Sequence, residues 1–126
     1  MSNKKTTEAF EYAKQEIPGL KAISAVEIAS GLPYGSLVVD KTFDLDAASA
    51  YNSEVIKAKI KAKNAMGMKS ERIQLMIIEL DTQVHMIQPS KDEKFLVYMA
   101  ADKSMNMGIT RHTMLEVSKM IQENIS

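Results

Sequence analysis

The residues best suited to chemistry in this chain are its two histidines and a few carboxylates, and their spacing matches no catalytic site. His85 and His112 each lack a second histidine or a carboxylate at the spacing of a zinc motif. Glu79 and Asp81 lie at a predicted strand end, where a carboxylate pair can serve acid–base catalysis. Acidic side chains are equally typical of a strand that turns into solvent. We therefore predict no metal site and no catalytic residue.

The motifs of nucleophilic and nucleotide chemistry are also missing from the sequence. The chain has no cysteine, which excludes a disulfide framework, a thiolate metal site and a cysteine nucleophile. Ser36 lacks the flanking glycine pattern of a hydrolase nucleophile. Neither the dinucleotide-binding GxGxxG nor the P-loop pattern occurs. We expect no cofactor, and we expect any nucleotide involved to be bound by a partner.

One charged feature stands out, a run of lysines in a predicted central helix. The whole chain balances 16 basic against 16 acidic side chains, which argues against nucleic acid as a partner. Residues 46–72 nevertheless hold six basic and three acidic side chains, an excess of three positive charges. Such charges can steer an acidic protein partner, although lysines on a solvated helix face are also common. The candidate partner-binding residues are Lys57, Lys59, Lys61 and Lys63.

An α/β framework is expected to position these residues. Helical patterns cover residues 7–17, 46–65 and 109–125, and strand patterns cover residues 20–28, 36–39, 73–80, 84–87 and 95–101. Pro18 and Gly19 end the first helix, and Asp44 or Asp46 can cap the second. The order α-β-β-α-β-β-β-α predicts a five-stranded antiparallel sheet with helices on both faces.

The length of the chain supports one domain. A chain of 126 residues builds a single core, and we expect residues 1–126 to form one domain with its core at about 7–125. The sequence has no apolar run of the ~18 residues that a membrane span needs, and its start lacks the apolar region of a signal peptide. We expect no direct membrane insertion and a cytoplasmic location.

The predicted central helix carries more apolar surface than one stripe requires. One helix face holds mainly alanines, and isoleucines extend it sideways. The first set comprises Ala48, Tyr51, Val55, Ala58 and Ala62, and the second comprises Ile56 and Ile60. The following strand pattern, residues 73–80, is also apolar and would leave an exposed edge. A homodimer is a common way to cover such surfaces.

Three short motifs, in this order, resemble the roadblock/dynein light chain domain family. They are IPG at residues 17–19, EIASGLP at residues 27–33, and NMGITR at residues 106–111. The resemblance extends from about Ile17 to residue 125. The sequence departs from the family in having Glu27 where aspartate is more usual, and in its lysine-rich central helix.

The resemblance implies a profilin-like fold, related to longin domains, that homodimerises through the central helix and the next strand into one continuous sheet. The interface residues expected on this basis are Val55, Ile56, Ile60, Gln74, Met76 and Ile78. Family members act as adaptors without catalytic activity, and some bind small Ras-like GTPases and modulate their nucleotide cycle. We therefore expect a homodimeric adaptor or regulator of a small Ras-like GTPase.

Two other functions fit the same sequence. A structural subunit of a dynein-like motor or a trafficking scaffold would have the same fold and differ only in its partner. A small-ligand sensor of profilin/PAS-like shape would instead contain a pocket lined by Phe95, Met99 and Met105. An enzyme is disfavoured because no nucleophile, base and orienting group can be assembled from the motifs present.

Overall fold

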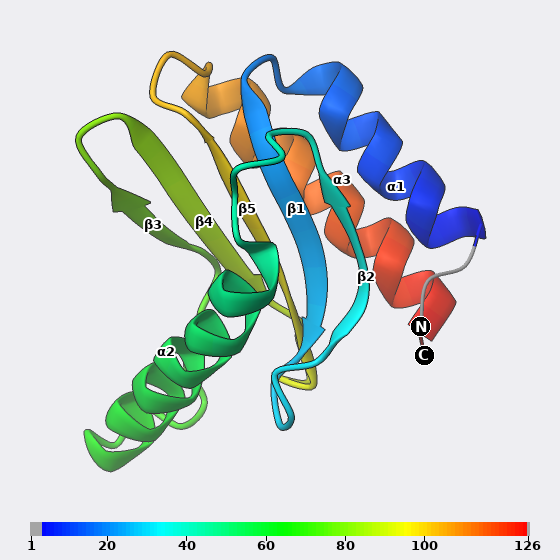
Figure 1. The fold of residues 1–126 in the computed structure, drawn as a ribbon. Helices are drawn as coiled ribbons and strands as arrows, with labels where there is room; N and C mark the ends of the chain where they lie inside the picture. Colours follow the sequence, from blue (N-terminus) through cyan, green and yellow to red (C-terminus); the bar gives the residue numbers. More distant parts are fainter. Residues whose placement is uncertain (1–3, 126) are drawn as a thin grey trace.

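The computed structural model describes residues 4–125 and contains one sheet with helices on both faces (Figure 1). Its elements are α1 (Lys4–Glu16), β1 (Leu20–Glu27), β2 (Pro33–Val38), α2 (Leu45–Ala65), β3 (Met76–Glu79), β4 (Gln83–Pro89), β5 (Phe95–Asp102) and α3 (Met107–Ile125). The strand order is β2-β1-β5-β4-β3, and every neighbouring pair is antiparallel. The predicted element order and fold class are confirmed.

The bounds of the elements differ from the prediction by up to three residues. Strand β2 begins at Pro33 rather than Ser36, and β4 covers Gln83–Pro89 rather than residues 84–87.

Tertiary contacts explain the changes in α1 and β3. Helix α1 begins at Lys4 rather than Thr7, because Thr6 is buried on the same face as Ala9 and Phe10 and tertiary packing extends the helix. Strand β3 has only four residues, although the apolar pattern begins at Ile73. In the β3–β4 register Met76 opposes Ile87, so Pro89 would oppose residue 74. Proline has no N–H to donate, and the ladder stops before it.

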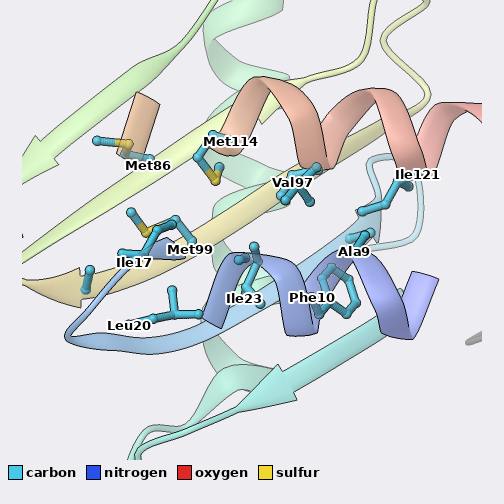
Figure 2. Packing of buried hydrophobic residues seen from close by; sticks show 14 of the residues in the cluster. Ala9, Phe10, Ile17, Leu20, Ile23, Met86, Val97, Met99, Met114 and Ile121 are labelled. Carbon is cyan, nitrogen blue, oxygen red and sulfur yellow. The ribbon is translucent and has the colours of Figure 1, made fainter. Parts of the chain in front are cut away.

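Helices α1 and α3 pack side by side over one face of the sheet (Figure 1). Their apolar side chains meet those of β1, β4 and β5 in the larger core cluster (Figure 2). Phe10 of α1, Met114 of α3 and Met99 of β5 lie at its centre and are almost fully buried. The two helices therefore close this face within the chain.

Helix α2 lies alone on the opposite face of the sheet (Figure 1). A second core cluster lies beneath it, where Ile56 meets side chains of β1, β4 and β5. The strand residues of this cluster include Ala22, Val26, Ile87, Leu96, Tyr98 and Ala100. In Figure 1 the C-terminal part of α2 extends past the strands.

The β1–β2 turn contacts α2 and sets its distance from the sheet. Gly31 in this turn has a φ of +76°, which favours glycine. A Cβ atom placed on Gly31 would lie 2.9 Å from Ser53 Oγ. The Lys57 ammonium also donates to the carbonyl of Ala29 at 3.0 Å. The EIASGLP motif thus forms a close-packed support for the middle of α2.

Candidate partner-binding surface

Helix α2 starts and ends at well-defined caps. The Asp44 carboxylate accepts a hydrogen bond from the backbone N–H of Ala47 at 3.0 Å, which satisfies one of the free donors of the first turn. Of the two predicted cap residues, Asp44 fills the role. At the other end Gly67 has a φ of +79° and follows the C-cap residue Met66. The 21-residue helix between these caps supplies the main candidate surface.

The outer face of α2 carries an apolar stripe that no other described element covers. Tyr51 is 74% exposed and Val55 is 40% exposed, and Met66 is also exposed at the end of the helix. Ala58 and Ala62 are exposed between them. These five residues are three or four positions apart, so they lie along one side of the helix. We call Tyr51, Val55, Ala58, Ala62 and Met66 the outer stripe.

The isoleucines of α2 point the other way. Ile56 is 0% exposed and belongs to the second core cluster, and Ile60 is half-buried against the same cluster. The expected interface set therefore combined two faces of the helix. Only Val55 of its three helical residues lies on the exposed face, and we correct the expectation for Ile56, whose side chain completes the core of its own chain.

Strand β3 lies at one edge of the sheet, so within residues 4–125 one side of its backbone has no neighbouring strand. Met76 and Ile78 are half-buried and pack against the second core cluster on the α2 side. Ile77 points to the other face and is exposed. Gln74 is exposed and precedes the strand. The structure thus brings the β3 residues of the expected interface to the same side of the sheet as α2.

The four candidate lysines occupy three different environments. Lys59 and Lys61 are exposed, and within the described residues neither forms an ion pair. By helical spacing they lie on opposite sides of the outer stripe. Lys57 is half-buried and bonds to Glu54 at 2.8 Å. Lys59 and Lys61 are therefore the two lysines best placed to meet a partner.

Lys63 has a structural role within the chain. It is 5% exposed, and its ammonium lies 3.6 Å from a Glu93 carboxylate oxygen in the β4–β5 turn. The same ammonium donates to the carbonyl of Lys69 at 3.3 Å and to the Asn64 side chain at 3.0 Å. A buried ammonium requires such partners. We correct the expectation that Lys63 contacts a partner, because its buried ammonium is bonded within the chain and its ion pair with Glu93 connects the end of α2 to the β4–β5 turn.

His85 belongs to an aromatic cluster beneath the start of α2. Its Nε2 lies 2.7 Å from Gln83 Oε1, which can only accept, so Nε2 carries the hydrogen. The Tyr98 hydroxyl then donates to Nδ1 at 3.1 Å, and Phe43 stacks on Tyr98. Burial lowers the pKa of His85 and raises the pKa of Tyr98. Burial therefore favours the neutral form of both groups, which pack beneath the helix.

The expected ligand pocket is not formed by the three residues proposed for it. Phe95 and Met99 are fully buried in the larger core cluster. Met105 instead lines a separate surface hollow, together with Pro18 and Ile109. These positions give the small-ligand alternative no common cavity.

The described part of the chain contains neither a metal-binding cluster nor a membrane-spanning helix. No group of three or more histidine or acidic side chains there is arranged to hold a metal ion. No helix there combines the length and hydropathy needed to cross a membrane.

Of the outer stripe, only Val55 is among the interface residues expected from the sequence. Tyr51 falls in the set of mainly alanine residues on one helix face, and Met66 follows the predicted helix of residues 46–65. The signal in the sequence is a second series of apolar residues on this helix, spaced three or four positions apart. A lone amphipathic helix needs one such series, so a second series on α2 indicates a second contact.

Comparison with solved structures identifies the fold. No family model and no curated protein matches the sequence significantly. MglB from Myxococcus xanthus superposes with a TM-score of 0.85 at 10% identity, over 98% of this chain and 97% of its own. The gliding protein MglB from Thermus thermophilus gives a TM-score of 0.82 at 14% identity, over 94% of this chain and 87% of its own.

A roadblock/LC7 domain from Streptomyces avermitilis gives a TM-score of 0.79 at 13% identity, over 91% of this chain and 92% of its own. All three identities are low, so the comparison establishes a shared fold over nearly the whole length of these chains.

Proposed function

We propose, from the roadblock-domain fold that this chain adopts, that it is a homodimeric cytoplasmic adaptor that binds a small Ras-like GTPase and modulates its nucleotide cycle or location. The observation that carries the proposal is the outer stripe of α2, together with the edge strand β3, whose Met76 and Ile78 lie on the same side of the sheet. The partner class comes from the family resemblance of the IPG, EIASGLP and NMGITR motifs.

The dimer would be symmetric and would use α2 and β3 together. Two copies related by a twofold axis can place their outer stripes against each other while their β3 edges pair. Such a contact would remove Tyr51 and Val55 from water and satisfy the free backbone groups of β3. Apolar contact along α2 and main-chain pairing along β3 would then form one continuous sheet across two chains.

The partner would meet the lysines that border the paired helices. Lys59 and Lys61 lie beside the outer stripe without an ion pair in the described residues, so they can attract an acidic surface. A Ras-like GTPase orders its switch loops around GTP. A platform that contacts those loops would therefore bind the GTP form more tightly and shift its population.

Light scattering after gel filtration tests the dimer. The chain has a mass of 14.0 kDa, and we expect the wild type to elute at about twice that mass. The double variant Tyr51→Glu/Val55→Asp would place two charges in the interface and should elute as a folded monomer. Leu115→Asp, at a similarly exposed apolar position on α3, is the matched control and should remain dimeric. A dimeric stripe variant would contradict the proposed interface.

Pull-down from lysate of the source cell tests the partner, with a non-hydrolysable GTP analogue in one lane and GDP in the other. We expect a small GTPase to be enriched with the analogue, and Lys59→Glu/Lys61→Glu to weaken its binding severalfold while the dimer stays intact. Binding should also weaken with added salt. Equal recovery of large subunits in both lanes would favour a structural adaptor of a motor or scaffold instead.

A further inference from the structure

A second surface lies on the opposite face of the molecule, along α3. Two hollows follow each other there, between α3 and the chain that leads into β3. The first has a volume of about 70 Å³ and is lined by Leu75, Arg111 and Leu115, among others. The second has a volume of about 350 Å³, and Arg72, Lys91 and Lys119 are among its lining residues. We call the two hollows together the α3 groove.

The two hollows meet at a polar contact. Gln88 lines the first hollow and Ser118 lines the second, and their side chains are hydrogen-bonded at 3.2 Å. Gln88 is almost fully buried. Its side-chain amide offers two N–H donors and an oxygen acceptor. The Ser118 hydroxyl donates to the oxygen. The two hollows are therefore adjacent, and a buried amide lies between them.

Positive charge is concentrated around this groove. Four basic side chains line the two hollows, against the single acidic residue Glu123, in a chain whose net charge is zero. Arg72, Lys91 and Arg111 are exposed and form no ion pair within the described residues. Lys119 forms a solvent-exposed ion pair with Glu116 at 3.5 Å, and such pairs contribute little to stability.

Apolar side chains accompany the charges at one end. Leu115 is 41% exposed on α3, and Leu75 is half-buried on the facing segment. Ile77 is exposed two residues further along the same segment. This end of the groove can receive an apolar side chain, whereas the other end presents only polar and charged groups.

We propose that the α3 groove binds an acidic amphipathic segment of a protein partner. Apolar side chains of the segment would contact Leu75 and Leu115, and its carboxylates would pair with the cations beyond them. Opposite charge favours this occupant over a basic or neutral segment. No aromatic side chain lines either hollow, so the groove lacks the stacking surface typical of sites for single-stranded nucleic acid.

Selection from a random 16-residue peptide library on phage tests the proposal with the full-length chain. We expect enriched sequences to combine aspartate or glutamate with leucine, isoleucine or phenylalanine. Synthetic peptides of those sequences should lose at least tenfold in affinity on Leu115→Ser and on Arg111→Gln, as measured by fluorescence polarisation. Both positions are exposed, so the variants should keep the wild-type Tm.

Two matched controls separate this surface from the proposed dimer. Ile109→Ser changes an equally exposed apolar residue of α3 that lines a different hollow, and Lys59→Gln changes an exposed lysine of α2. Both should bind the peptides as the wild type does. Failure to enrich any sequence, enrichment of sequences without carboxylates, or equal binding to all four variants would overturn the proposal. Preferential binding of phosphatidylserine vesicles over every peptide, lost in the groove variants, would also overturn it in favour of a lipid site.

Discussion

The two faces of the sheet differ in how completely the chain covers them. On one face, α1 and α3 lie side by side and enclose the larger core cluster, with Phe10 fully inside it. On the other face, α2 is alone and buries Ile56 while leaving Tyr51 in solvent. An amphipathic helix with one apolar stripe completes a fold, and a helix with two such stripes also offers a contact to another molecule.

The largest effect should come from removing Phe10 on the closed face. Phe10→Ala would leave a cavity in the larger core cluster and should lower the free energy of unfolding by about 3–5 kcal/mol. That is a large part of the total stability of such a domain. Urea denaturation followed by circular dichroism measures the change. A loss below about 1 kcal/mol would show that this face is less closed than its packing indicates.

Two neighbouring residues of α2, one buried and one exposed, allow the cost of truncation to be compared within one helix. Ile56→Ala should cost about 2–5 kcal/mol because Ile56 is buried in the second core cluster. Val55→Ala, one position away on the outer stripe, should cost the isolated protomer less than about 0.5 kcal/mol. The comparison requires protein dilute enough to be monomeric, since dimerisation adds stability. Equal losses in the free energy of unfolding at the two positions would contradict the assignment of one stripe to the core and the other to solvent.

Lys63 sharpens the contrast between structural and exposed lysines. Lys63→Glu would place a carboxylate beside Glu93 and remove the bonds to Lys69 and Asn64. We expect a loss of about 2 kcal/mol in the free energy of unfolding, discounted because Glu93 is partly exposed. Lys59→Glu is the matched control and should leave thermal unfolding unchanged. A Lys63 variant of wild-type stability would return this residue to the partner-binding set.

The smallest expected effect is a pH dependence from the cluster beneath α2. Burial lowers the pKa of His85 below its ordinary value near 6.5, so the unfolded chain binds a proton more readily than the folded chain. The contribution of His85 to the free energy of unfolding is therefore fully present above about pH 6.5, and it falls as the pH drops below that value.

Thermal unfolding at pH 7.5 and pH 5.5 measures this dependence, with the lower Tm expected at pH 5.5. His85→Gln should reduce the difference between the two values, because glutamine does not titrate. An unchanged difference in the variant would assign the effect to other groups. The low pKa values of Asp40, Asp92 and Asp102 place their titration below this pH window.

Sequence patterns predicted most of the fold because its signals are local. Pro18 and Gly19 end α1, Asp44 caps α2, and short runs rich in apolar residues mark β1 and β5. Each of these depends on a few neighbouring residues, whose backbone preferences hold in almost any context. The shortened β3 was not predicted, because its extent depends on Pro89 in the neighbouring strand.

The amino-acid sequence by itself determined the order of the elements, the caps and turns that bound them, and the presence of two apolar stripes on α2. Only the tertiary structure decided which stripe is inward, and with it that Ile56 completes the core while Tyr51 remains outside. It also decided that Lys63 is buried beside Glu93 and that Arg72, Lys91 and Arg111 gather along α3. Helical periodicity specifies which residues share a face, but which face meets the sheet depends on contacts between residues distant in the sequence.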